Sequence, residues 1–313
     1  MKKAKKWIAI IICIALIAAA VAIVVIYGQK WTTETNTYDV SDAFSSIHIS
    51  ADAVDVKVLP SETGESKVVC VENKKVHHKI SVEDNVLTIG DGEEKNLVEK
   101  VYRMISKQVI TIYLPIAEYN DLIIENSTGN IEVAQIGSFS MVDISLSTGD
   151  VDFSTNVVGL TKIKATTGNV SVKNAELGSL IAEVTTGNIE ISNVNCEASL
   201  TADVTTGDAE LENILCENLY SDGETGELSM ENVIAKGKFE IDRDTGDVEI
   251  ERCDAQELYI TTDTGDVEGS LLSDKVFIAS TDTGNVKVPQ TTTGGICKIT
   301  TDTGDIHITI VNK

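Results

Sequence analysis

The sequence predicts an all-β protein: a single-stranded parallel β-helix, or solenoid, of about ten rungs. A Thr-Gly pair recurs every 19 or 20 residues. Apolar residues alternate with polar ones on both sides of each glycine, which is the period of a strand. A repeat this short leaves no room for a crossover helix, so successive copies stack in parallel and bury their apolar faces against each other. The repeated glycines are Gly129, Gly149, Gly168, Gly187, Gly207, Gly226, Gly246, Gly265, Gly284 and Gly304.

Each rung is expected to hold two short strands. The positions seven, five and three before the glycine, and two, four and seven after it, are mostly apolar; around Gly187 they are Leu180, Ala182, Val184, Ile189, Ile191 and Val194. A tight turn at Thr-Gly-Asp/Asn and a looser corner near the seventh following residue would connect the strands. At a strand spacing of about 4.8 Å, ten rungs make a rod roughly 45 Å long. A leucine-rich repeat has a similar period, but its helix-forming half and Asn/Cys ladder are missing.

We interpret the Thr-Gly pairs as turns and not as ligand sites. The glycine supplies a positive φ without a steric penalty, and the following Asp or Asn also suits a turn. The threonine shares the parity of the inward residues, so we expect the ten threonines to point into the corner of the coil.

The N-terminal residues predict a membrane anchor. Residues 1–6 contain four lysines, and residues 7–27 form an uncharged run of 21 residues, long enough for a helix that crosses a bilayer. Lysines before the span favour a cytoplasmic N-terminus, with the rest of the chain outside the cell and residues 28–40 as a linker. The alternative is a cleaved signal peptide with its small-residue site at 18–20.

Residues 41–120 are β-rich without the strict period and are expected to form an irregular cap and first rungs, before the regular β-helix of residues 121–313. In this cap, Ile47, Ile49, Val54, Val56 and Val58 alternate like a first rung, and Asp84-Asn85 forms a turn between two strands. Residues 94–106 have the spacing of a short amphipathic helix. The chain ends one strand after Gly304, so the C-terminal rung is expected to be uncapped and able to self-associate.

The formal net charge is −24, and the part of the chain beyond the four N-terminal lysines carries about −28. Such a chain does not attract nucleic acid. Two carboxylate columns flank the last turns, and hard oxygen ligands at this density suit Ca²⁺. A solvated acidic edge is the simpler interpretation, and no other cofactor is indicated. The candidate Ca²⁺ edge consists of Asp244, Asp247, Asp263, Asp266, Asp302 and Asp305.

The sequence shows no catalytic constellation and predicts that the protein is not an enzyme. The four histidines are scattered, and His77-His78 fits a surface strand pair better than a metal site. Cys196 and Cys216 each follow their glycine by nine residues and should stack in adjacent rungs, either as buried thiols or as a bridge. Carboxylates are abundant, so a carbohydrate-active enzyme remains a third hypothesis.

Three features together resemble a bacterial family: the repeated Ser/Thr-Thr-Gly-Asp/Asn-Ile/Val-x-Val motif, the segment Val82–Ile89, and Ile112-Tyr113-Leu114-Pro115 before the first regular rung. It is the putative-adhesin family of domains of unknown function, with a β-helical, LiaX-like repeat. The resemblance covers residues 40–313 and implies a non-enzymatic surface module, in some members tied to envelope stress. The long helical segment of the LiaX-like members is missing from this chain.

These observations favour a membrane-anchored, extracytoplasmic, adhesin-like binding or structural module of the bacterial cell envelope. Its expected partners are the membrane itself and an envelope protein, a glycan or a cationic peptide. The alternative of a different class is a regulator of envelope stress or of the response to antimicrobial peptides.

Overall fold

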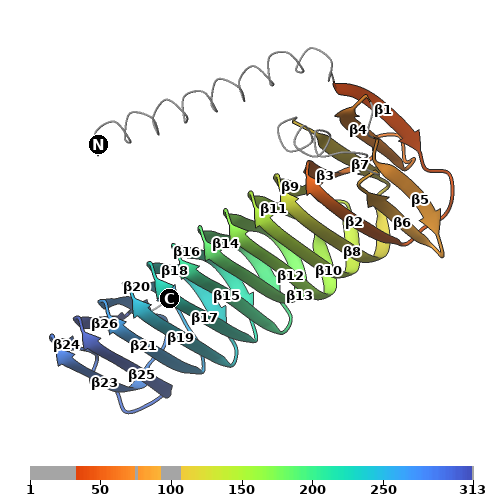
Figure 1. The fold of residues 1–313 in the computed structure, drawn as a ribbon. Helices are drawn as coiled ribbons and strands as arrows, with labels where there is room; N and C mark the ends of the chain where they lie inside the picture. The colour runs from red at the N-terminus through yellow and green to blue at the C-terminus, as the bar shows by residue number, and fades with distance from the viewer. Residues whose placement is uncertain (1–32, 75–76, 93–106, 312–313) are drawn as a thin grey trace, which may run out of the picture.

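A computed structural model describes residues 33–74, 77–92 and 107–311 of the chain. Every regular element in these ranges is a β-strand, and together they form a parallel β-solenoid of about ten turns (Figure 1). Within the same ranges, no helix has the length and hydropathy that a bilayer span requires. The predicted membrane span at 7–27 and the predicted helix at 94–106 lie outside the described residues.

The cap and the first rung contain seven strands: β1 (Thr33–Asp39), β2 (Ser46–Ala53), β3 (Asp55–Pro60), β4 (Lys67–Asn73), β5 (Lys79–Glu83), β6 (Val86–Gly90) and β7 (Val109–Leu114). The regular rungs contain β8 (Ala117–Thr128), β9 (Ile131–Val133), β10 (Gly137–Thr148), β11 (Val151–Phe153), β12 (Asn156–Thr167), β13 (Val170–Thr186), β14 (Ile189–Cys196), β15 (Ser199–Thr206), β16 (Ala209–Cys216), β17 (Asn218–Thr225), β18 (Leu228–Ala235), β19 (Lys238–Thr245), β20 (Val248–Cys253), β21 (Glu257–Thr264), β22 (Val267–Leu271), β23 (Lys275–Thr283), β24 (Val286–Lys287), β25 (Gly295–Thr303) and β26 (Ile306–Ile310).

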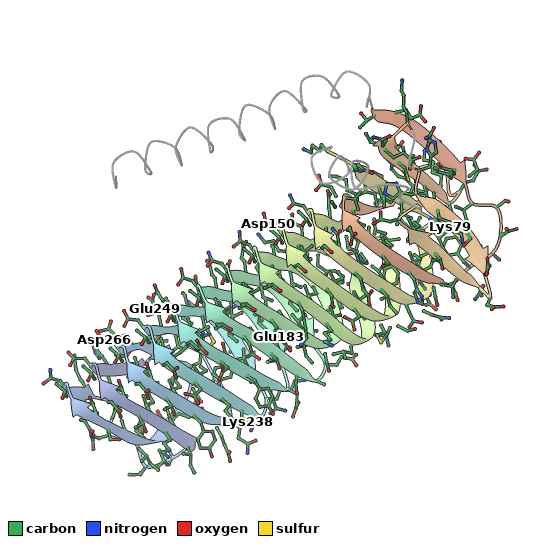
Figure 2. All side chains as sticks on the ribbon, in the orientation of Figure 1. Lys79, Asp150, Glu183, Lys238, Glu249 and Asp266 are labelled. Atoms are coloured by element: carbon green, nitrogen blue, oxygen red, sulfur yellow. The ribbon has the colours of Figure 1, made fainter. Side chains whose placement is uncertain are left out.

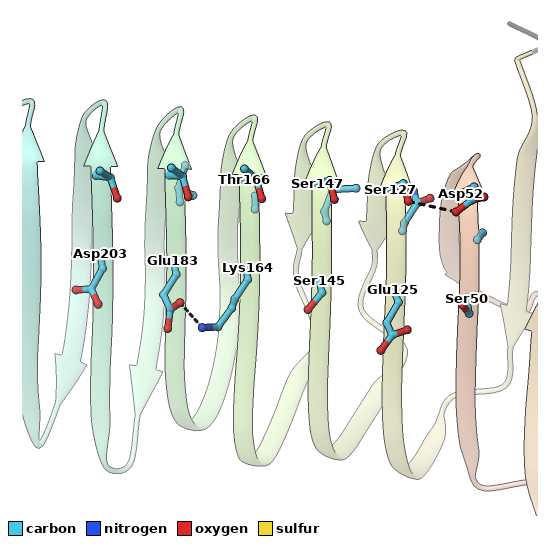
Figure 3. Close-up of a pocket in the computed structure, with 17 residues that line it drawn as sticks. Ser50, Asp52, Glu125, Ser127, Ser145, Ser147, Lys164, Thr166, Glu183 and Asp203 are labelled. Carbon is cyan, nitrogen blue, oxygen red and sulfur yellow. Dashed lines mark hydrogen bonds and ion pairs between the residues drawn. The ribbon is translucent and has the colours of Figure 1, made fainter. Parts of the chain in front are cut away.

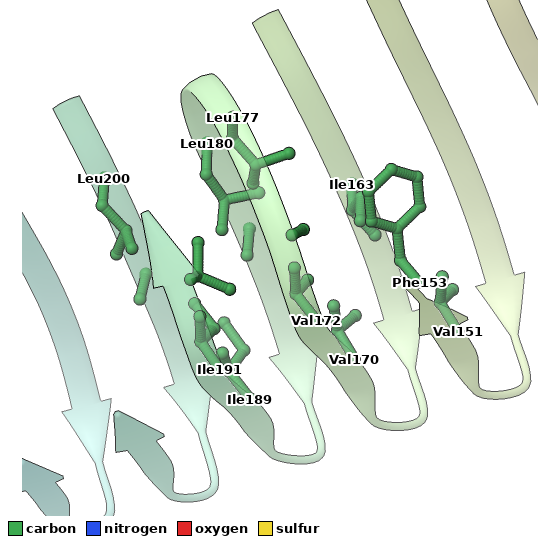
Figure 4. Close-up of a cluster of buried hydrophobic side chains, with 14 of the residues drawn as sticks. Val151, Phe153, Ile163, Val170, Val172, Leu177, Leu180, Ile189, Ile191 and Leu200 are labelled. Atoms are coloured by element: carbon green, nitrogen blue, oxygen red, sulfur yellow. The ribbon is translucent and has the colours of Figure 1, made fainter. Parts of the chain in front are cut away.

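The regular rungs form two faces. The strands that end at a Thr-Gly turn, such as β10, β12, β15 and β17, make the leading face; those that follow the turn, such as β14, β16 and β18, make the following face. Equivalent residues lie in register, for example Leu180 opposite Leu200 and Val170 opposite Ile189. Alternate side chains from both faces meet in one continuous apolar core (Figure 4).

The cap combines parallel and antiparallel pairing. β2 and β3 pair in parallel with β8 and β9, so they form a first rung with its apolar residues buried, as the alternation predicts. β1 and β4, β4 and β7, and β5 and β6 pair in antiparallel. The hairpin between β5 and β6 turns at Asp84 (φ 50°) and Asn85 (φ 67°), as predicted. The antiparallel strands cover this end of the rod.

The turn glycines are needed for two reasons. All ten have positive φ, from 128° to 159°. In addition, each turn sits against the backbone of an adjacent rung: a Cβ on Gly149 would lie 2.1 Å from the carbonyl oxygen of Gly129, and a Cβ on Gly187 would lie 2.1 Å from that of Gly168. The glycines therefore form a column in which a side chain has no space.

The prediction for the threonines before these glycines is wrong, because the strand leaves the core one residue before the turn. The last inward residue lies three positions before the glycine, as Val184 does before Gly187. All ten threonines are exposed: Thr128, Thr148, Thr167, Thr186, Thr206, Thr225, Thr245, Thr264, Thr283 and Thr303.

The second corner of the coil contains an asparagine ladder that the sequence analysis missed. Asn174, Asn193, Asn213 and Asn232 each follow a glycine by six residues and adopt φ of 52° to 55°. Each amide donates to the previous one, with Nδ2 to Oδ1 distances of 3.4 Å, 3.2 Å and 2.8 Å. Asparagine tolerates this left-handed conformation better than other residues with a side chain, which explains the repeated choice.

The last two rungs do not stack in chain order. β25 pairs with β21 on one side and with β23 on the other, and β26 lies likewise between β22 and β24. The final segment of the chain is thus inserted, and β23 and β24 form the tip of the rod (Figure 1). The expectation that the C-terminal rung is the uncapped one is wrong. Simple periodicity does not distinguish the two orders, because both rungs carry the same motif.

Candidate functional site

A polar groove crosses the leading face over β2, β8, β10, β12, β13 and β15 (Figure 3). Its volume is about 670 Å³. Its walls come from the positions four and two before each glycine, which point outward. These residues are Ser50, Asp52, Glu125, Ser127, Ser145, Ser147, Lys164, Thr166, Glu183, Thr185, Asp203 and Thr205. One side of the groove is thus a row of five hydroxyls that begins after Asp52, and the other is a row in which two serines alternate with residues of both charges.

The charged row of the groove is partly paired. Lys164 forms an ion pair with Glu183 in the adjacent rung. Asp203 accepts a hydrogen bond from the backbone N–H of Asp222 at 3.0 Å. Burial raises the pKa of Asp203, although that hydrogen bond acts in the opposite direction. In the other row, Ser127, Ser147, Thr166 and Thr185 are exposed, and Ser127 Oγ donates to Asp52 Oδ1 at 3.3 Å.

The floor of the groove contains one buried polar side chain. Asn126 occupies the inward position three before its glycine, where neighbouring rungs carry Ala51 and Leu146. It is 5% exposed. Its Nδ2 donates to the carbonyl oxygen of Val54 at 2.8 Å, while its Oδ1 has no hydrogen-bond partner among the described residues. A hydrogen-bond acceptor thus lies just below the row of hydroxyls.

Beyond the groove the leading face becomes acidic. We call Asp222, Glu224, Glu240, Asp242, Asp244 and Asp263, on β17, β19 and β21, the acidic patch. Burial, followed by the neighbouring Asp222 and Asp244, raises the pKa of Asp242. One lysine lies at the border of this patch (Figure 2): Lys238 Nζ is 2.6 Å from Glu240 Oε2 and 4.9 Å from the ring centroid of Tyr220. The patch therefore already holds one alkylammonium group, by a carboxylate and an aromatic face.

A buried arginine lies behind the acidic patch. Arg243 points into the core and is 1% exposed, and its Nη2 donates to Ser221 Oγ at 2.7 Å. Space for the guanidinium comes from Gly223 in the adjacent rung, where a Cβ would lie 1.8 Å from Nη1. Burial lowers the pKa of Arg243, and the nearby Asp222 and Asp203 oppose that shift. The positive charge of Arg243 thus offsets part of the negative charge of the acidic patch from inside the coil. The sequence alone did not reveal this role.

The six residues of the predicted Ca²⁺ edge fall in two columns with different roles. Asp244, Asp263 and Asp302 are exposed on the leading strands. The others follow a glycine and stabilise the stack: Asp247 Oδ1 accepts the N–H of Asp266 at 2.8 Å, and Asp266 Oδ1 accepts that of Asp305 at 2.7 Å. In the described part of the chain, no three of the six carboxylates come within 4.8 Å of one another.

The cap contains a buried cluster around Glu72, which is 0% exposed. Its Oε2 accepts from the backbone N–H and from Nδ1 of His78 at 2.6 Å and 2.8 Å; its Oε1 accepts from Asn36 and Tyr38, both at 2.8 Å. Burial alone would raise the pKa of Glu72, but these hydrogen bonds outweigh it and lower the pKa to about 2. The interpretation of His77-His78 as a surface strand pair is wrong for His78, which is buried and is not in a strand.

Five cysteines lie in the described residues, and all are buried free thiols: Cys70, Cys196, Cys216, Cys253 and Cys297. Of the two alternatives for Cys196 and Cys216, the structure shows the pair of thiols. Burial raises the pKa of both to about 12, so neither is an ionised nucleophile at neutral pH.

The profile of the Toastrack DUF4097 family matches residues 44–202 and 198–313. This protein belongs to the Toastrack family. The Toastrack match covers the first rung, the regular rungs and most of the cap, and it agrees with the resemblance to β-helical putative adhesins of unknown function. A search of curated proteins finds no match.

Several solved structures are similar to this Toastrack protein. One is named a putative adhesin from Parabacteroides distasonis, with 14% identity, a TM-score of 0.46, and coverage of 89% of this chain and 97% of that one. Another is named a putative adhesin from Bacteroides fragilis, with 17% identity, a TM-score of 0.37 and the same coverage. A third is named a putative lipid binding protein from Parabacteroides distasonis, with 15% identity, a TM-score of 0.32 and again the same coverage.

Proposed function

We propose that this protein is a membrane-anchored, extracytoplasmic binding module of the bacterial cell envelope, and that the polar groove holds an extended glycan. The observation that carries the proposal is the row of hydroxyls, which repeats at the strand spacing of about 4.8 Å across five neighbouring strands, from Ser127 on β8 to Thr205 on β15. A polysaccharide also presents regularly spaced groups that donate and accept hydrogen bonds. A linear ligand with such a repeat can make the same contacts on successive rungs.

Binding of envelope glycans to the purified full chain tests this proposal. A Ser147→Ala/Thr166→Val double variant removes two central hydroxyls, and we expect roughly 10-fold weaker binding, at about 1 kcal/mol or less for each lost hydrogen bond. Ser171→Ala removes a hydroxyl from the following face and serves as the control. Equal affinities of the parent and both variants for every glycan would contradict a role of the groove.

The membrane anchor rests on the sequence of residues 1–27. We expect the full chain to fractionate with membranes and its solenoid to be digested by protease added to intact cells without an outer barrier. Deletion of residues 7–27 should release the protein from the membrane fraction. A solenoid protected from external protease in such cells would place it on the other side of the membrane.

We further propose that the protein acts without catalysis. In the groove, Glu183 is already paired with Lys164, and Asp203 with the backbone of Asp222. These contacts suit a fixed binding surface. Turnover of a bound glycan that disappears on a single carboxylate substitution, such as Glu125→Gln, would instead support the carbohydrate-active enzyme.

A second candidate function is the capture of cationic peptides, as in a regulator of envelope stress. The observation that favours it is Lys238, whose ammonium is held by Glu240 and Tyr220 at the border of the acidic patch. Peptide binding that is lost in high salt and weakened by Asp242→Asn/Asp244→Asn would support this function. Asp266→Asn, on the turn edge, is the matched control. Peptide binding that is insensitive to both salt and the patch variant would exclude it.

A further inference from the structure

The cap brings together three different kinds of metal ligand. Cys70, Glu72 and His78 each offer one ligand atom, and these atoms lie within 4.8 Å of one another. All three residues are buried. Cys70 and Glu72 are two residues apart on β4, so they point to the same side of the strand, and His78 follows in the segment before β5. In the described residues, this is the one group of three potential ligands that are so close together.

We propose that Cys70, Glu72 and His78 form a Zn²⁺ site in the cap. A thiolate, a carboxylate and an imidazole are the ligand types that Zn²⁺ combines in proteins, typically in a tetrahedral arrangement. Two ligands of such a centre lie roughly 3.5 Å apart, as follows from metal–ligand distances of about 2.0–2.3 Å. Oε2 of Glu72 and Nδ1 of His78, now 2.8 Å apart, would separate slightly to admit the metal between them, and a water molecule would complete the coordination.

The surroundings of the cluster fit the outer shell of a metal site. Metal-bound histidines usually donate their second ring N–H to a carboxylate, a backbone carbonyl or a water molecule. Nε2 of His78 has no hydrogen-bond partner among the described residues, and the nearest carboxylate oxygen that it faces is Asp91 Oδ1 at 3.8 Å. The His78 side chain is 1% exposed. If Zn²⁺ takes Nδ1, the ring proton moves to Nε2 and faces Asp91.

Residues of β1 orient the Glu72 carboxylate toward the proposed metal position. Asn36 and Tyr38 both donate to Oε1, which fixes the orientation of the carboxylate. Oε2, the oxygen on the side of His78, accepts from the Nδ1 that the metal would bind. On binding, the metal would take the place of the imidazole proton between these two atoms, which moves to Nε2, and would displace the thiol proton of Cys70. Binding would thus release one proton, that of the thiol.

Titration of the purified full chain, stripped of metal with a chelator, tests the site with Zn²⁺ and with Co²⁺ as a spectroscopic substitute. We expect one equivalent to bind, a higher melting temperature with Zn²⁺, and a thiolate-to-cobalt charge-transfer absorption with Co²⁺. Cys70→Ser should abolish this absorption, and Asp91→Asn should weaken Zn²⁺ binding roughly 10-fold. Cys196→Ser, which removes a buried thiol elsewhere in the rod, is the control and should leave the Co²⁺ absorption and the Zn²⁺ affinity unchanged.

Two results would overturn the proposal. One is the lack of Zn²⁺ binding by the parent chain. The other is Co²⁺ absorption that persists in Cys70→Ser, because the metal would then occupy another site. Should Cys70→Ser fail to fold, Glu72→Gln replaces the carboxylate with a group of the same shape and keeps the test decisive. The metal titration does not depend on glycan binding. A failure of the proposed glycan-binding function can therefore be distinguished from a failure of the Zn²⁺ site.

Discussion

At the scale of single residues, the turn glycines are fixed by their neighbours as well as by their own conformation. The carbonyl oxygen of one turn occupies the space that a side chain of the next turn would need. The acidic or amide residue after most of these glycines also serves the stack, because its side-chain oxygen accepts the backbone N–H of the equivalent residue in an adjacent rung, as Asp150 does for Asn169 at 2.8 Å. The motif Thr-Gly-Asp/Asn thus describes contacts between rungs.

Two glycine substitutions separate the effect of a positive φ from the effect of a backbone atom too close to the new Cβ. Gly187→Ala combines φ of +136° with a Cβ 2.1 Å from the Gly168 oxygen, and we expect it to lower the free energy of unfolding by at least ~2 kcal/mol. Gly64→Ala has φ of +76° but no atom within 4 Å of the new Cβ, and should cost only about 1 kcal/mol. Chemical denaturation measures both. Equal losses would show that the stacked turns are not the constraint.

The acidic patch makes stability depend on pH. Because the pKa of Asp242 is raised in the folded state, its contribution is fully present below the pKa of the unfolded chain and is lost as the pH rises through the folded pKa. We expect Asp242→Asn to be more stable than the parent at pH 7, by roughly 0.5 kcal/mol after solvent screening, and equal to it near ~pH 3. Asp266→Asn should be nearly neutral, since an amide oxygen accepts the same N–H. A pH-independent effect of Asp242→Asn would contradict this account.

At the scale of strands and corners, the coil has two unlike corners. One is the glycine turn; the other is the asparagine ladder, in which the residue provides both the left-handed backbone conformation and a side-chain hydrogen bond to the next rung. The ladder ends at Arg252, which occupies the same position with φ of 53°. The corner therefore keeps its backbone shape even where the amide is lost.

Substitutions of Asn213 distinguish the two contributions of the ladder. Asn213→Gly keeps the positive φ and loses the side-chain contacts with Asn193, Asn232 and the neighbouring Glu212, which should cost about 1 kcal/mol. Asn213→Ala adds the penalty of a left-handed non-glycine residue, for a total of roughly 2 kcal/mol. Thermal and denaturant unfolding of both variants measure the difference. If alanine were as well tolerated as glycine, the backbone conformation would not be the reason for the asparagine.

The sequence predicts the strand period, the first rung, the hairpin at Asp84-Asn85 and the turn positions, because these depend on contacts within one or two rungs. It does not predict that the ten threonines are exposed, since parity along a strand says nothing about where the strand leaves the core. It also misses the buried hydrogen bonds between Glu72 and His78, because this cluster is formed by residues of β1, of β4 and of a loop that are separated in the sequence. The sequence does not reveal the groove either, because each rung contributes only two outward side chains to it and the groove forms only when the rungs stack.

At the scale of the whole molecule, the rod has a covered end and an open end. The antiparallel strands of the cap cover the first, whereas β23 and β24 each pair on one side only, with β25 and β26. Ile278 on β23 is 54% exposed and Val286 on β24 is 43% exposed. Between the two ends, the leading face changes from a row of hydroxyls to the acidic patch, so position along the rod selects the chemistry that a partner meets.

Engineered cysteine pairs test the order of the last rungs. Thr261 and Ser280 each lie opposite Thr300, on its two sides. We therefore expect a disulfide in Thr261→Cys/Thr300→Cys and none in Thr261→Cys/Ser280→Cys, whose positions are two strand spacings or about 9.6 Å apart, beyond the reach of a disulfide. Mass spectrometry after mild oxidation detects the bridge. A bridge in the second pair alone would show that the rungs stack in chain order.

The inserted final segment determines how the rod would respond to a mechanical pull. A strand at the end of a stack peels away by breaking one ladder of hydrogen bonds. β25 and β26 instead are bonded on both sides, to β21 and β22 and to β23 and β24. A force on the C-terminus must therefore break two ladders together before any rung unwinds. For a module fixed at its other end to a cell, this arrangement would delay unravelling under tension.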